Sequence, residues 1–131
     1  MKTKLTQSDI RFFKKTVARA GGKAASIQKS GIVVQRKDDR SIVTQADLIV
    51  QEYLIKKISR RLGPVNFIYE EGDRRQATLP HDSLTVIIDP IDGTAMFSMH
   101  LPLWCVSVGI FLGDEPLYGF VYAPGLDLFF H

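Results

Sequence analysis

The chain has 131 residues, of which 45% are hydrophobic and 24% are charged, and its formal net charge is +3. This length and composition predict one globular domain with a substantial core and exclude an intrinsically disordered chain. The single cysteine excludes an internal disulfide and favours a reducing compartment, so we expect a cytoplasmic protein. No apolar run approaches the ~20 residues of a membrane span, so we expect no membrane partner.

The first half of the chain carries two helical patterns and most of the positive charge. Apolar residues at three-and-four spacing predict a helix over residues 8–29. A second helix is predicted from Thr44 to about residue 63, with Ile49 among its buried side chains. Two adjacent glycines inside the first helix, at residues 21–22, indicate a bend or a close contact.

Residues 1–61 hold 15 lysines and arginines against 5 acidic residues. A basic half can indicate nucleic acid as a partner. The cations are scattered over helical faces without a recognised nucleic-acid motif, so we expect a solvated surface that attracts anionic substrates. A basic nucleic-acid-binding module remains the alternative from a different functional class.

The second half carries strand patterns separated by turn signals. The predicted strands cover residues 65–69, 84–88, 106–112, 117–123 and 126–130. Turn residues at 113–116 and 124–125 join the last three strands as hairpins. Two helices followed by hairpin-linked strands predict an α+β fold, in which two helices pack on one face of a mostly antiparallel sheet.

The most informative segment is Leu-Thr-Val-Ile-Ile-Asp-Pro-Ile-Asp-Gly-Thr at residues 84–94. Its apolar run stops at Asp89, which the following proline keeps extended, and Asp92 comes three residues later. Two carboxylates at the mouth of a buried strand repel each other unless a cation lies between them, and oxygen ligands on a stiff turn suit Mg²⁺. Gly93 permits a tight turn, and the N–H groups of Gly93 and Thr94 are placed to hold an anion beside the metal.

An ordinary turn is the competing interpretation of this segment, because Asp-Pro and Asp-Gly are common turn formers. The spacing of the acids does not fit an EF-hand loop, and no phosphate-binding glycine loop is present. Thr44 and Asp47 also fit a helix capping box that needs no catalysis, and the two roles of Asp47 are compatible. The acidic pair Glu70-Glu71 fits a solvated turn equally well.

Three segments occur in a fixed order along the chain. They are Lys-Asp-Asp-Arg-Ser-Ile-Val-Thr-Gln-Ala-Asp at residues 37–47, Glu-Glu at residues 70–71 and Asp-Pro-Ile-Asp-Gly-Thr at residues 89–94. Their order, composition and separations resemble the inositol monophosphatase family of metal-dependent, lithium-sensitive phosphatases. The resemblance runs from about residue 20 to the last residue. It implies a fold like the N-terminal half of that family's layered αβαβα sandwich.

The resemblance also implies a role for each matching residue. The residues that resemble the family's metal ligands are Glu70, Asp89, Ile91 through its backbone carbonyl, and Asp92. Thr94, together with Glu70, resembles the pair that orients the attacking water, and Asp47 resembles the acid that polarises the Thr94 hydroxyl. Gly93 and Thr94 resemble the residues whose backbone N–H groups bind phosphate. Lys37 matches a lysine that the family often has near its site.

The chain also departs from the family pattern. Met96 stands where the family commonly has Asn or Glu, which bears on substrate preference more than on metal binding. Family members are about twice as long, and their second half supplies another metal-binding aspartate and most substrate-binding residues. We therefore expect the N-terminal half of such a phosphatase, which forms a homo-oligomer or pairs with a missing C-terminal half.

The implied function is Mg²⁺-dependent hydrolysis of a small phosphate monoester, such as an inositol phosphate, a sugar phosphate or 3′-phosphoadenosine 5′-phosphate. Such chemistry uses metals to neutralise the phosphate charge and to activate water. It needs no cysteine or histidine nucleophile, and the solitary Cys105 is not a convincing one. The alternative is a catalytically incomplete metal-binding fragment that needs the missing half.

Overall fold

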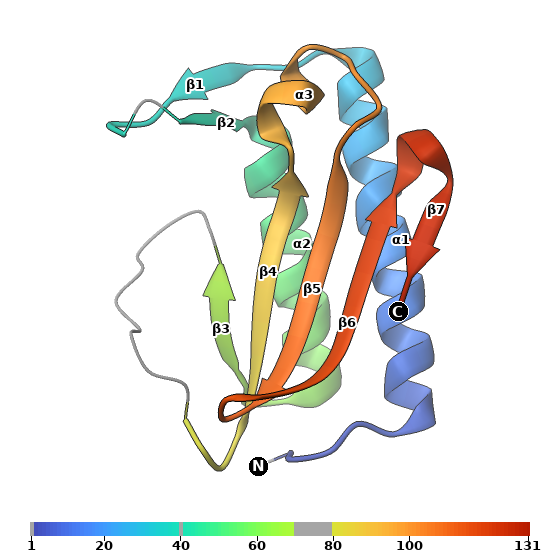
Figure 1. Ribbon diagram of the computed structural model, residues 1–131, viewed down its shortest axis with the longest axis vertical. Helices are drawn as coiled ribbons and strands as arrows, with labels where there is room; N and C mark the ends of the chain where they lie inside the picture. The colour runs from blue at the N-terminus through green and yellow to red at the C-terminus, as the bar shows by residue number, and fades with distance from the viewer. Residues whose placement is uncertain (1, 40, 70–79) are drawn as a thin grey trace.

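The computed structural model describes residues 2–39, 41–69 and 80–131. Its elements in chain order are α1 (Gln7–Ser30), β1 (Val34–Arg36), β2 (Ile42–Thr44), α2 (Gln45–Leu62), β3 (Asn66–Tyr69), β4 (Leu84–Asp92), α3 (Thr94–Ser98), β5 (Cys105–Leu112), β6 (Glu115–Ala123), the 3₁₀ helix η1 (Pro124–Leu126) and β7 (Leu128–Phe130). The two long helices, α1 and α2, lie side by side on one face of the main sheet (Figure 1). The predicted α+β class is confirmed.

In the described part of the chain, the main sheet has five strands in the order β3-β4-β5-β6-β7. Of these strands β3 and β4 pair in parallel, and each later pair along the sheet is antiparallel. In the parallel pair Tyr69, the last residue of β3, lies opposite Ile88 of β4. Asp89 and Asp92 follow Ile88 within β4, which continues to Asp92.

Helix α1 is built as its sequence predicts. Thr6 caps its first turn, and its apolar stripe, which includes Phe13, is buried against the sheet. Phe13 stacks on Phe120 of β6, with the ring centroids 5.3 Å apart. A Cβ at Gly21 would lie 2.4 Å from Cδ2 of Tyr122, so this glycine serves a close contact between α1 and β6. The sequence left a bend or a close contact as the reason for the glycine pair, and the position of Gly21 supports the close contact.

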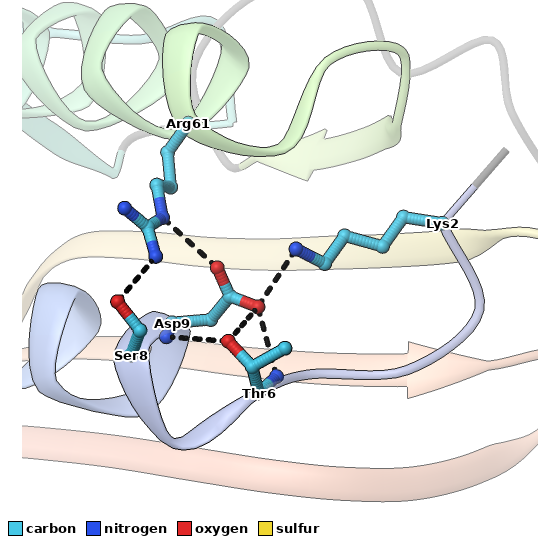
Figure 2. Close-up of polar contacts among 5 residues, drawn as sticks. All are labelled: Lys2, Thr6, Ser8, Asp9 and Arg61. Atoms are coloured by element: carbon cyan, nitrogen blue, oxygen red, sulfur yellow. Dashed lines mark hydrogen bonds and ion pairs between the residues drawn. The ribbon is translucent and has the colours of Figure 1, made fainter.

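A buried carboxylate joins the start of α1 to the end of α2 (Figure 2). Asp9 accepts hydrogen bonds from the backbone N–H and hydroxyl of Thr6, both at 2.8 Å. Its other carboxylate oxygen lies 2.9 Å from Nε of Arg61, and Lys2 Nζ lies 2.7 Å from Oδ2. Burial would raise the pKa of Asp9, but the bonds from Lys2, Thr6 and Arg61 together hold that pKa well below its ordinary value.

The face of the sheet opposite the helices is less covered. Along β5, buried residues alternate with half-exposed ones, and the buried set, such as Val106 and Val108, belongs to the core beneath the helices. The half-exposed set includes Ser107, which pairs with Asp89 of β4. The candidate carboxylate therefore lies on the open face of the sheet.

Three sequence predictions need correction. Ile49 is 47% exposed, because the buried stripe of α2 follows Ala46, Val50, Leu54 and Ile58 and leaves Ile49 to one side. Strand β4 continues to Asp92 instead of ending at residue 88. The strand predicted over residues 126–130 is shorter, because η1 occupies Pro124–Leu126 and β7 covers Leu128–Phe130. In addition, the short elements β2 and α3 were not predicted. In the part of the chain that the structure describes, no helix is long and apolar enough to cross a bilayer.

Candidate active site

Asp47 joins the start of α2 to the end of β4. It is fully buried at the third position of α2, where Oδ2 accepts hydrogen bonds from the Thr44 backbone N–H at 2.8 Å and from the Thr44 hydroxyl at 2.7 Å. Its second oxygen, Oδ1, accepts a hydrogen bond from the Thr94 hydroxyl at 3.1 Å. The predicted capping box is confirmed, and the same carboxylate also reaches Thr94.

The Thr94 hydroxyl has two acceptors beside it. Besides Asp47, the backbone carbonyl oxygen of Ile91 lies 3.0 Å from Oγ1. A hydroxyl carries one proton and two lone pairs. Because both neighbours accept, the proton points toward them and the lone pairs are left to accept from a third group. That geometry suits a hydroxyl that orients a water molecule.

Gly93 makes the turn between β4 and α3. Its φ of 94° lies in the left-handed region that glycine adopts without strain. A Cβ at this position would lie 2.8 Å from the carbonyl oxygen of Leu103. The pairing register shifts between Asp89 and Asp92, which marks a β-bulge just before the turn. The bulge lies between Asp89 and Asp92, and the turn lies between Asp92 and Thr94. Together they change the direction of the chain from the carboxylates to the Thr94 hydroxyl.

The carboxylates of Asp89 and Asp92 share one neighbourhood. Asp89 is half-exposed and Asp92 is exposed. Cys105 of β5 pairs with Asp92 of β4, and its Sγ lies 4.0 Å from Asp92 Oδ2. Burial, and then the negative charges of Asp92 and Asp89, raise the pKa of the Cys105 thiol above its ordinary value. The sequence predicts only that Cys105 is not a nucleophile, and the strand register shows that it borders the carboxylates.

The donor atoms here fit a hard cation. Two carboxylates and the Ile91 carbonyl offer oxygen ligands, which Mg²⁺ prefers. Among the described residues, no group of three or more acidic, cysteine or histidine side chains forms a metal site. Glu70, the fourth predicted ligand, lies outside the described residues, as does Glu71.

Lys37 lies at the turn that joins β1 to β2 and is half-exposed. Its backbone N–H donates to the Ser41 carbonyl at 2.8 Å.

Of the predicted site residues, the structure brings together Asp47, Thr94 and Ile91 by direct contact. Asp89 and Asp92 are related through their common neighbour Cys105.

Comparisons with known proteins agree with this fold and show the family. The model of the inositol monophosphatase family matches residues 6–131, and the chain belongs to that family. Inositol monophosphatase 1 of Saccharomyces cerevisiae is 36% identical over 87 residues, which make up 66% of this chain and 30% of that protein. The solved IMPase of Thermotoga maritima superposes with a TM-score of 0.82 at 27% identity, over 94% of this chain and 47% of that one.

A second solved structure shares the fold at lower identity. It is an IMPase/NADP phosphatase complexed with Mg²⁺ and phosphate, with a TM-score of 0.81 at 18% identity over 94% of this chain and 46% of that one. The chain thus spans less than half the length of these relatives. The resemblance to the N-terminal half of the family, inferred from three short motifs, is confirmed.

Proposed function

We propose that this chain carries the metal-binding and water-orienting residues of a Mg²⁺-dependent phosphomonoester hydrolase. The observation that carries the proposal is the contact between Asp47 and Thr94, which sets a buried carboxylate behind a hydroxyl at the end of β4. Asp89 and Asp92 belong to the same strand, and the family membership favours phosphatase chemistry for such a site.

Asp89, Asp92, the Ile91 carbonyl and Glu70 are the groups proposed to hold the metal. Parallel pairing of β3 with β4 supports this set, since Tyr69 and Ile88, the residues just before Glu70 and Asp89, lie opposite each other. When bound, Mg²⁺ would offset the charge of the phosphate oxygens and lower the pKa of a bound water. The solved complex of the IMPase/NADP phosphatase with Mg²⁺ and phosphate is consistent with this choice of ion.

Thr94 is proposed to orient the attacking water, together with Glu70. Its proton is directed toward Asp47 and Ile91, so Oγ1 is free to accept a hydrogen bond from water. The Asp47 carboxylate keeps this orientation because its other oxygen, Oδ2, accepts the hydrogen bonds of the α2 cap from Thr44. A water that donates this hydrogen bond to Thr94 would keep a lone pair available for attack on phosphorus.

The backbone N–H groups of Gly93 and Thr94 are proposed to bind phosphate. The first N–H groups of a helix have no partner within the helix, and Thr94 is the first residue of α3. The substrate class is a small phosphate monoester, namely an inositol phosphate, a sugar phosphate or 3′-phosphoadenosine 5′-phosphate. Met96, which is exposed on α3, is the residue of this segment placed to influence that choice.

A second candidate is a metal-binding module that is inactive until another polypeptide or a second copy completes it. The observation that favours it is the open face of the sheet, where Asp89 is half-exposed. In addition, Leu128 and Phe130 are exposed on the edge strand β7. Exposed apolar strand edges favour pairing with another chain. In either case the metal site and the orientation of Thr94 are the same.

Titration calorimetry with Mg²⁺ tests the metal site without any assumption about turnover. We expect binding to the wild-type chain and its loss in Asp89→Asn, which preserves shape but removes the charge. Asp114→Asn is the matched control, because Asp114 is exposed in the turn between β5 and β6. Equal heats for the wild type and Asp89→Asn would reject the site.

A further inference from the structure

Gln28 near the end of α1 reaches the segment that links α3 to β5. Its Nε2 donates hydrogen bonds to the carbonyl oxygens of Phe97 at 3.1 Å and Leu101 at 3.0 Å. Its Oε1 accepts a hydrogen bond from Nε1 of Trp104 at 3.3 Å. Both amide protons and the amide oxygen are therefore used on one segment, about seventy residues away in sequence.

Two further contacts fix the same segment. The buried rings of Phe97 and Trp104 meet edge to face, with centroids 5.0 Å apart. A Cβ at Gly125 would lie 2.6 Å from Cβ of Pro102, so η1 presses closely on the segment. The hydrogen bonds of Gln28 complete a rigid attachment that ties the segment to α1.

This segment is continuous with the proposed phosphate-binding turn. Thr94 begins α3, Phe97 lies one turn later, and the Phe97 N–H donates to the Gly93 carbonyl at 2.9 Å. At the far end, the Leu103 carbonyl lies so close to Gly93 that a Cβ there would be 2.8 Å away. A shift of the segment would therefore move Gly93 and Thr94 with it.

We propose that Gln28 is a positioning residue for the phosphate-binding turn. It touches no reacting atom and acts by fixing α3, so that Thr94 stays against Asp47 and the N–H groups of Gly93 and Thr94 stay aimed at phosphate. The inference rests on the proposed function of that turn. The metal ligands Asp89 and Asp92 belong to β4, which is held by its neighbours β3 and β5 and not by Gln28. Gln28 therefore affects phosphate binding more than metal binding.

The chain offers a matched control in Gln45. Its Oε1 accepts a hydrogen bond from the Val33 N–H at 2.6 Å, and its Nε2 donates to the Gly31 carbonyl at 2.8 Å. Gln45 thus makes the same kind of side-chain bridge between a helix and a backbone segment. Its bridge holds the connection from α1 to β1 and does not involve the α3 segment.

Hydrogen–deuterium exchange of the metal-free chain tests the structural part. In Gln28→Met we expect amide exchange to rise by about tenfold in residues 94–104, because several ordinary hydrogen bonds are lost, with α1, α2 and β4 unchanged. Gln45→Met is expected to raise exchange in residues 31–36 and to leave residues 94–104 unchanged. Unaltered exchange in residues 94–104 of Gln28→Met, or a rise throughout the chain, would overturn the proposal.

Ligand binding tests the functional part on the same proteins. In Gln28→Met, inorganic phosphate is expected to bind about tenfold more weakly in the presence of Mn²⁺, while the Mn²⁺ affinity stays within about twofold of the wild type. Equal weakening of metal and phosphate, or no weakening, would overturn the positioning role. If the wild type itself binds no metal, the proposed function fails, and the exchange experiment still decides whether Gln28 fixes the α3 segment.

A milder variant covers the case in which Gln28→Met does not fold. Trp104→Phe removes one of the three hydrogen bonds of Gln28 and keeps a ring against Phe97. Exchange in residues 94–104 should then rise by about two- to tenfold, less than in Gln28→Met. Exchange at the wild-type rate in Trp104→Phe would contradict the inference.

Discussion

Asp47 accepts a hydrogen bond from the Thr94 hydroxyl at 3.1 Å, although the two residues are 47 positions apart in the sequence. Its other oxygen caps α2 through Thr44, as Asp9 caps α1 through Thr6. The two Thr-x-x-Asp caps differ in what the second oxygen meets. Asp9 meets Arg61, and the contact joins two helices, whereas Asp47 meets a hydroxyl at the candidate active site. One local motif thus serves structure in one place and the site in the other.

Thr94→Ala should separate turnover from metal binding. In a full-length version of the protein, loss of the hydroxyl removes the group that orients water, so phosphate-ester hydrolysis should fall by about 100-fold or more while Mg²⁺ affinity stays near wild type. Phosphate release from inositol 1-phosphate, measured alongside calorimetry, checks both quantities. Thr94→Ser keeps the hydroxyl and should retain most of the activity. Comparable activity in the alanine and serine variants would show that Thr94 is a turn residue only.

Asp9 should make stability depend on acid pH. Burial alone would raise the pKa of Asp9, but Lys2, Thr6 and Arg61 hold it below its ordinary value of 3.8. A carboxylate with a depressed pKa in the folded state contributes stability that is complete above the unfolded pKa. That contribution disappears as the pH falls below about 4 and through the folded pKa.

Urea unfolding between pH 2 and pH 7 measures this contribution. Asp9→Asn should lower the free energy of unfolding by about 1–3 kcal/mol at neutral pH and by less at the acid end. Arg61→Gln is the control, because it removes one ion-pair partner of Asp9 and leaves the hydrogen bonds that Asp9 accepts from Thr6. The same free-energy deficit in Asp9→Asn at every pH would contradict the assignment.

The two adjacent glycines of α1 should respond oppositely to alanine. A Cβ at Gly21 would collide with Tyr122, whereas a Cβ at Gly22 would meet nothing within 4 Å. Gly21→Ala is expected to destabilise the fold by about 1–3 kcal/mol through overpacking. Gly22→Ala should stabilise it by about 0.5–1 kcal/mol, because alanine favours a helix interior. Thermal unfolding of both variants checks the pair, and a shift of the same sign in both would refute the close contact.

The sequence predicted the long elements well because their signals are periodic. Residues 8–29 predicted a helix that the structure places at Gln7–Ser30, and apolar runs separated by turn residues predicted the five strands along the chain. Short elements carry too few residues for a period, so β2 and α3 were missed. Ile49 was misassigned because a single apolar residue at the edge of a helical stripe gives no signal of its exposure.

Only part of the candidate site could be predicted from the sequence. The capping box of Asp47 follows from local spacing, and the turn at Gly93 follows from its glycine. Gln28 and Cys105 had no local signal. Gln28 reaches Phe97 across 69 positions, and Cys105 approaches Asp92 only through the register of β5 with β4. Contacts of this kind depend on tertiary packing, which a local pattern does not encode.

The decisive question for the proposed site is whether metal creates a phosphate-binding site on this chain. Equilibrium binding of inorganic phosphate should be measured with and without Mg²⁺, for the wild type and for Asp89→Asn. We expect phosphate to bind the wild type only when Mg²⁺ is present, and Asp89→Asn to bind none under either condition. Phosphate binding that is independent of Mg²⁺, or that survives in Asp89→Asn, would contradict the metal-dependent site proposed for the end of β4.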